Sequence, residues 1–159
     1  AVEAIMRELA GHFGYDPEVW GLAGLLHDID YDMTKDDPAK HSLLAAEILE
    51  GLGVDNEIIY AVKAHNGYHG IERKRKIDKA LYCADPVSGL ITAAALILPS
   101  KKLSDVDENF VLRRMDEKAF ARGADREQIR SCSELGLTLE EFIAIALSAM
   151  KKVAEDLGL

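Results

Sequence analysis

Apolar residues recur at helical spacing along this chain, and no segment alternates apolar and polar residues as a half-buried strand does. The clearest pattern lies in the last segment, Thr138 to Leu157, where the apolar residues share one helix face. They are Leu139, Phe142, Ile143, Ala146, Leu147, Met150, Val153, Ala154 and Leu157. We therefore expect an all-α fold, a compact bundle of roughly seven to eight helices.

Capping residues, glycines and prolines indicate where these helices begin and end. Gly14 follows the first apolar stripe, and Asp16-Pro17 offers an N-cap followed by a first-turn proline. Asp55 caps a later helix, Thr138 opens the last one with a Thr-x-x-Glu box, and Pro86 should kink the longest one. The predicted helices cover about residues 1–12, 17–27, 41–50, 56–65, 77–98, 105–120, 125–135 and 138–157, with a loop at 29–40.

Length and composition narrow the class of protein. A chain of 159 residues suits one domain over residues 1–159. Cys83 and Cys132 fit neither a disulfide framework nor a zinc pattern, which indicates a cytoplasmic protein, and no apolar run suits a membrane helix. The net charge of -9 argues against an extended nucleic-acid surface, which needs clustered Lys and Arg, but leaves a small phosphorylated substrate open.

Histidines and acids of the kind that bind divalent metals stand isolated in apolar surroundings. His27 and Asp28 end the apolar run before them, and His41, His65 and Asp85 follow downstream. An unpaired carboxylate buried within the apolar helix around Asp85 would cost several kcal/mol, so we expect a cation beside it. A metal shared with His27 and Asp28 meets this need, and a Lys or Arg partner is the alternative. Helix-cap, turn or core roles are the alternatives for the other residues.

The segments Gly24-Leu25-Leu26-His27-Asp28-Ile29-Asp30 and Leu81-Tyr82-Cys83-Ala84-Asp85 resemble the signature of the HD-domain superfamily of metal-dependent phosphohydrolases. The resemblance implies the all-α HD-domain fold and one divalent ion between His27, Asp28 and Asp85. His41 and His65 resemble two histidines that hold a second ion in some branches. The leading histidine of the signature would stand just before Ala1 and is absent from this chain.

A narrower resemblance links the chain to small bacterial proteins that consist of little more than this domain. It extends over Trp20 to Asp28, over Ala84-Asp85 followed by Gly89 to Ile91, and over Lys118 to Ala121 followed by Arg126-Glu127. These matches cover nearly the whole length and imply no particular substrate.

The resemblance implies a phosphohydrolase that attacks a small phosphate ester or nucleotide with metal-activated water. Asp28 suits a catalytic, bridging position because a carboxylate has two oxygens, and Asp30 is expected either to orient a ligand or to act as a general acid. Imidazole-rich ligation favours one or two ions of iron, manganese, zinc, nickel or cobalt. The basic run Arg73 to Lys76 either receives substrate phosphate or forms a solvated surface. A non-catalytic binding or regulatory module and a di-iron oxygenase on the same scaffold are the alternative functions.

Overall fold

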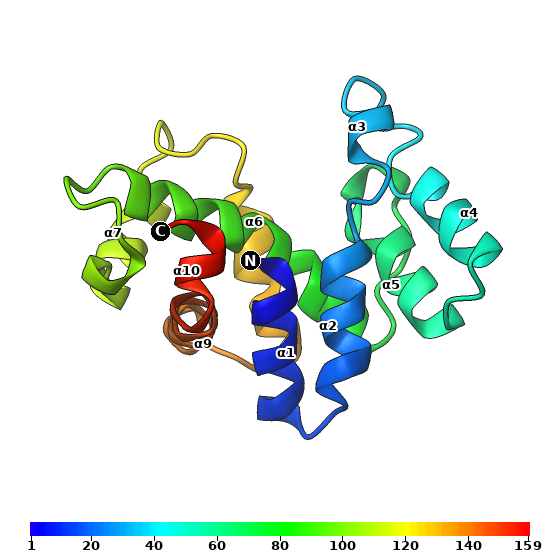
Figure 1. Ribbon diagram of the computed structural model, residues 1–159, viewed down its shortest axis with the longest axis horizontal. Coiled ribbons are helices and arrows are strands. Elements are labelled where there is room, and N and C mark those ends of the chain that lie inside the picture. Colours follow the sequence, from blue (N-terminus) through cyan, green and yellow to red (C-terminus); the bar gives the residue numbers. More distant parts are fainter.

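The computed structural model describes residues 1–159 and contains helices but no strand, which confirms the predicted all-α class (Figure 1). Seven of the ten α-helices have nine residues or more, in agreement with the predicted number. The α-helices are α1 (Val2–Phe13), α2 (Pro17–Leu26), α3 (Tyr31–Thr34), α4 (Leu43–Gly51), α5 (Asn56–His65), α6 (Lys76–Leu96), α7 (Glu108–Asp116), α8 (Arg126–Arg130), α9 (Leu139–Lys152) and α10 (Ala154–Leu157). Three short 3₁₀ helices are η1 (Gly67–His69), η2 (Leu103–Asp105) and η3 (Ser131–Leu135).

Helices α1 and α2 form an antiparallel pair whose turn follows the predicted signals. Gly14 adopts a left-handed conformation with φ of 74° at the end of α1, and the Asp16 side chain accepts a hydrogen bond from the Glu18 N–H. At the other end of the pair, a Cβ on Gly24 would stand 2.9 Å from the Cα of Glu3. The start of α1 therefore lies directly against the last turn of α2.

The long helix α6 runs through the middle of the molecule and contacts α1, α5 and α8 (Figure 1). Pro86 lies inside α6 without ending it. Because proline has no N–H, the carbonyl of Tyr82, four residues earlier, loses its usual helical donor. The Gln128 side chain replaces that donor at 2.7 Å and so fastens α8 to α6.

Several predicted boundaries differ from the observed ones. The predicted loop at 29–40 contains the short helix α3, and the predicted helix 105–120 is shortened to α7 after the turn η2. Residues 125–135 divide into α8 and η3, and the last segment divides at Val153 into α9 and α10. The capping residues Asp55, Asp125 and Thr138 all make their expected bonds, so the beginnings of these three helices are correct. The predicted beginnings of α4 and α7, at residues 41 and 105, precede the observed ones.

One cluster of 39 buried residues connects the helices from α1 to α9. The core is therefore continuous, and one domain over residues 1–159 stays a prediction. Cys83 and Cys132 are both buried free thiols, as expected. None of the helices combines the length and the hydropathy needed to span a membrane.

Candidate metal centre

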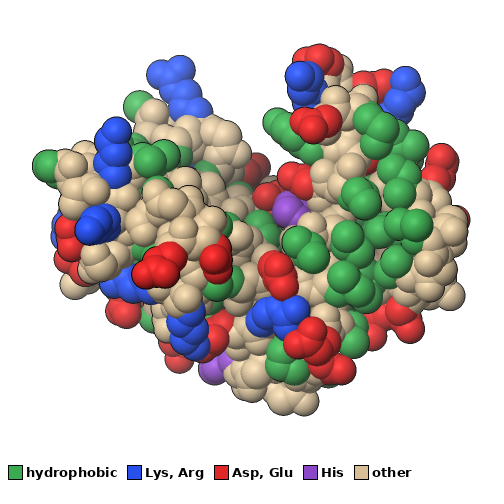
Figure 2. Space-filling model, viewed as in Figure 1, with side chains coloured by type: hydrophobic (Ala, Val, Ile, Leu, Met, Phe, Trp, Pro, Cys, Tyr) green, Lys and Arg blue, Asp and Glu red, His purple; other side chains and the backbone are tan.

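The predicted site residues come from four separate elements and meet in one place. His27 is the C-cap of α2, His65 is the last residue of α5, Asp85 lies midway along α6, and His41 stands just before α4. Figure 2 shows the surface hollowed between the part that carries α3 and the C-terminal part of the chain, with histidine and acidic side chains at the bottom of the hollow. The fold therefore brings together residues that are up to 58 positions apart, from His27 to Asp85 (85 − 27).

The carboxylate of Asp28 lies at the centre of this group, and its two oxygens face different partners. Oδ2 lies 3.4 Å from Nε2 of His27, whereas Oδ1 lies 3.4 Å from Nε2 of His41 and 3.7 Å from Nε2 of His65. On the first side, Nε2 of His27 also lies 3.7 Å from Oδ1 of Asp85. His27, Asp28 and His65 alone offer three ligand atoms within 4.8 Å of one another.

The two separations of 3.4 Å fit metal ligation, and the two of 3.7 Å are slightly longer than a bound ion would impose. Two donor atoms that each lie about 2.1 Å from one ion stand about 3.0–3.4 Å apart in octahedral or tetrahedral geometry. The structure also sets the tautomer of each ring. Nδ1 of His27 contacts the carbonyl of Gly24 at 2.8 Å, and Nδ1 of His65 contacts that of Val62 at 2.6 Å. Because a carbonyl only accepts, Nδ1 carries the proton and the Nε2 lone pair points at Asp28, as in metal-bound histidines.

His41 is oriented by Asp30, which is fully buried. Nδ1 of His41 donates to Oδ1 of Asp30 at 3.0 Å, and Oδ2 accepts from the backbone N–H groups of Ser42 at 2.8 Å and Ala45 at 3.1 Å. Ser42 has a left-handed backbone with φ of 69°, an uncommon conformation for a residue other than glycine. The buried carboxylate of Asp30 thus fixes both the start of α4 and the ring of His41.

A second set of contacts, which the sequence interpretation left out, holds the segment before α4. The Asn66 side chain donates to the carbonyls of Pro38 at 3.1 Å and His41 at 3.0 Å. Nε2 of His69 contacts the same His41 carbonyl at 2.8 Å. Asn66 follows His65 directly, so these bonds tie the backbones of two candidate ligands together. A helix-ending Asn-Gly pair was the only sequence signal at this position.

The electrostatics of the centre follow from its mixture of buried imidazoles and carboxylates. Burial opposes the charge on His27, but the carboxylates of Asp85 and Asp28 outweigh it and raise the pKa of His27. Burial likewise opposes the charge on Asp28, but His65, His27 and His41 outweigh it and lower the pKa of Asp28. A carboxylate that stays ionised among imidazoles is suited to hold a cation.

Two expectations about the surroundings need correction. The Asp85 side chain is 39% exposed and lines a cavity, so the cost of full burial does not apply to it. No Lys or Arg pairs with Asp85; its ionic neighbour is His27. In the basic run, Arg73 pairs with Glu134, Arg75 pairs with Asp78, and Lys76 lies over the ring of Phe13, so these side chains have partners within the protein.

Comparisons with known proteins bear on the class of site. The sequence profile of the HD domain matches residues 1–119. A curated relative, ribonuclease Y of Sulfurovum sp. strain NBC37-1, is 31% identical over 130 residues, which cover 79% of this chain and 25% of that protein. Ribonuclease Y of Aliarcobacter butzleri strain RM4018 is 30% identical over 152 residues, covering 92% and 29%. The chain thus spans about a quarter of the length of these relatives. No solved structure gives a significant match.

Proposed function

Because this chain belongs to the HD domain family, a superfamily of metal-dependent phosphohydrolases, we propose that it hydrolyses a phosphate ester of a nucleotide or a short RNA. The observation that carries the proposal is the position of Asp28, whose two oxygens face separate groups of metal-ligand side chains. A carboxylate can serve two ions in this way, whereas a neutral imidazole offers one lone pair.

Two half-sites share Asp28 in this proposal. His27 and Asp85 lie on the side of Oδ2, and His41 and His65 lie on the side of Oδ1. An imidazole-rich set of this kind favours manganese, iron, cobalt, nickel or zinc. A divalent ion bound there would lower the pKa of a water molecule and withdraw charge from the phosphoryl oxygens.

The protein itself orients the ligands and shapes the approach of the substrate. Of the two roles expected for Asp30, we favour the orienting one, because both of its oxygens already accept hydrogen bonds inside the protein. Asp28 and Asp85 remain about two-fifths exposed, so a phosphate group can reach them from solvent. The ionised Asp28 is held in this state by the surrounding imidazoles.

Both relatives described above are named ribonucleases, which favours RNA as the molecule that carries the phosphate ester to be hydrolysed. The net charge of -9 limits the length of RNA that this chain can bind by itself, because long nucleic acids require many Lys and Arg contacts. We therefore propose a short ribonucleotide substrate rather than an extended RNA duplex.

The test begins with elemental analysis of the purified protein, followed by hydrolysis assays with p-nitrophenyl phosphate, bis(p-nitrophenyl) phosphate and short ribonucleotides. We expect hydrolysis that disappears with a chelator and returns with a divalent transition metal. Asp28→Asn should reduce the rate by at least about a thousandfold, because both half-sites lose their shared ligand. Asp32→Asn changes a nearby exposed acid outside the cluster and should leave the rate within twofold.

Aerobic and anaerobic reactions are run in parallel because hydrolysis needs no oxygen. A product that forms only in air would replace the hydrolase proposal by an oxygenase. A protein that binds metal but cleaves none of these esters would instead be a binding or regulatory module.

A further inference from the structure

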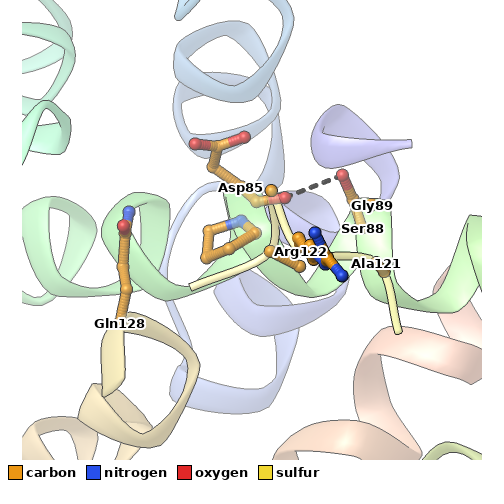
Figure 3. Close-up of a pocket in the computed structure, with 9 residues that line it drawn as sticks. Asp85, Ser88, Gly89, Ala121, Arg122 and Gln128 are labelled. Atoms are coloured by element: carbon orange, nitrogen blue, oxygen red, sulfur yellow. Dashed lines mark hydrogen bonds between the residues drawn. The ribbon is translucent and has the colours of Figure 1, made fainter. Parts of the chain in front are cut away.

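A cavity of about 350 Å³ opens beside the metal centre. Asp85, Ser88 and Gly89 of α6 form one wall, and the segment 121–124 faces them (Figure 3). Asp85 is also the carboxylate next to His27, so the cavity adjoins the proposed site of hydrolysis. Its volume lies at the lower end of the range of small-ligand pockets, about 300–1,000 Å³. The cavity is thus placed to receive a part of the substrate that does not react.

The loop wall of this cavity is held rigidly from behind by Arg126. The Arg126 guanidinium donates to five backbone carbonyls, those of Ala121 (2.7 Å), Ala124 (2.5 Å), Phe120 (2.5 Å), Arg114 (3.2 Å) and Glu117 (3.4 Å). Ala121 adopts a left-handed backbone with φ of 43°, a conformation that persists in an alanine only when surrounding contacts enforce it. The same loop is yellow in Figure 1, where it lies on the same side of α6 as α3 and apart from it.

The other polar groups of the cavity are already engaged. The Gln128 amide donates to the Tyr82 carbonyl that Pro86 leaves without a donor, and the Ser88 hydroxyl donates to the Asp85 carbonyl at 2.8 Å (Figure 3). Asp85 itself faces His27. Each of these side chains has a partner within the protein, and none of them offers a positive charge to an anion, although the Gln128 amide keeps a second, neutral N–H.

Arg122 is the exception. It lines the cavity, is exposed, and makes no hydrogen bond, salt bridge or aromatic contact within the protein. Every other arginine in the chain has at least one such partner. The chain has 28 acidic residues, so the lack of a carboxylate partner for Arg122 is unexpected. A guanidinium carried on a rigid loop beside a phosphohydrolase centre is suited to bind phosphate through two parallel hydrogen bonds.

We propose that this cavity binds a second, non-reacting phosphate of the substrate through Arg122. The inference rests on the proposed function and narrows its substrate class to ribonucleotides with two consecutive phosphates, one at the metal centre and the next beside Arg122. Asp85 separates the two positions, being a candidate ligand on one side and a cavity wall on the other.

The test compares two substrates that differ by one phosphodiester. The metal-loaded protein is assayed with the dinucleotide ApA, which has one phosphate, and with the trinucleotide ApApA, which has two and can bind in either direction. We expect a higher kcat/KM for the trinucleotide. Arg122→Ala should lower kcat/KM for the trinucleotide by about ten- to hundredfold more than for the dinucleotide, because a bidentate charged contact is lost. Arg122→Lys should give an intermediate value because it keeps the charge without the fork.

Arg113→Ala is the matched control, since Arg113 is another exposed arginine without an ionic partner but lies outside the cavity. It should leave both kcat/KM values unchanged. An equal effect of Arg122→Ala on the two substrates would overturn the subsite while leaving hydrolysis intact. If the loaded protein cleaves neither substrate, it is titrated with ApApA by calorimetry. If Arg122→Ala then weakens the binding of ApApA at least tenfold, the result supports the subsite although the hydrolase proposal fails. If ApApA does not bind, or if Arg122→Ala leaves its binding unchanged, both proposals are overturned.

Discussion

Replacing Asp30 by asparagine tests how the ring of His41 is oriented. The substitution keeps the shape of the side chain but leaves one acceptor oxygen where the carboxylate has two. If that oxygen keeps the N–H groups of Ser42 and Ala45, the new NH₂ group faces Nδ1 of His41. Two donors cannot share one hydrogen bond, so the imidazole proton must move to Nε2. The nitrogen that faces Asp28 then has no lone pair for a metal.

The size of the effect follows from these three bonds. Hydrogen bonds to a charged group contribute about 1.5–3 kcal/mol, against about 0.5–1.5 kcal/mol for neutral ones. Weakening the bonds to Ser42 and Ala45 and reorganising the one to His41 should therefore lower the free energy of unfolding by about 2–3 kcal/mol. Loss of a group that orients a ligand typically lowers metal affinity by about 10–100-fold. We expect this loss for one ion, with the half-site of His27 and Asp85 less affected.

Urea unfolding of the metal-free protein measures the change in stability, and calorimetric metal titration measures affinity at each half-site. The imidazole ¹⁵N shifts of His41 report directly which nitrogen carries the proton. Asp78→Asn is the control, because Asp78 is the other fully buried carboxylate and accepts from the N–H groups of Lys74 and Arg75, away from the site. It should destabilise the protein but leave metal affinity unchanged.

The reasoning about Asp30 would be refuted by an Asp30→Asn variant that keeps the Nδ1-protonated ring of His41. It would equally be refuted if Asp30→Asn and Asp78→Asn weakened metal binding to the same extent, since the loss would then reflect general destabilisation.

Three further predictions concern the metal centre and its supports. The pKa of His27 is raised above 6.5, so protons should begin to compete with the metal for its imidazole at a pH above that value. Below the raised pKa, the affinity for the metal should fall by about tenfold per pH unit. Metal titrations at several pH values check this, and an affinity that stays constant down to pH 6 would contradict it. Gly24→Ala should lower the free energy of unfolding by about 1–3 kcal/mol, because its methyl group would press on the Glu3 backbone 2.9 Å away. Urea unfolding measures the change in stability. An unaltered urea midpoint would show that α1 and α2 make room for the methyl group without loss of stability. A histidine added before Ala1 should tighten metal binding about tenfold or more, since the start of α1 adjoins the last turn of α2; calorimetry against an added alanine is the comparison.

Local signals predicted the beginnings of the helices that have a capping side chain, and they singled out the candidate ligands. Asp16, Asp55 and Thr138 cap their helices through bonds to residues two or three positions away, so the sequence alone contains the necessary information. His27 and Asp28 were identified from their place at the end of an apolar run. The structure places their ligand atoms near that of His65, and their role as metal ligands stays a prediction.

The remaining features depend on contacts between distant residues. The backbone groups that bind the buried Asp30 carboxylate lie 12 and 15 positions later in the chain. No local pattern therefore distinguishes Asp30 from the exposed Asp32. Asp85 lies in an apolar stretch of the sequence, and its 39% exposure shows only in the folded chain. The cavity at Arg122 likewise needs the loop before α8 to meet α6, 33 positions apart from Ser88 to Ala121 (121 − 88).

The three imidazoles of the centre owe their orientation to structures of very different range. His27 and His65 each bond to a carbonyl three residues earlier in their own helix, so a single formed turn suffices to aim them. His41 relies on a carboxylate 11 residues away, within a segment that must dock as a whole. Assembly of the centre should therefore be stepwise during refolding: α2 and α5 can present their nitrogens early, and the His41 half matures only after the chain between Asp30 and Ala45 has closed. On heating, the His41 side should lose its arrangement before the rings of His27 and His65 do.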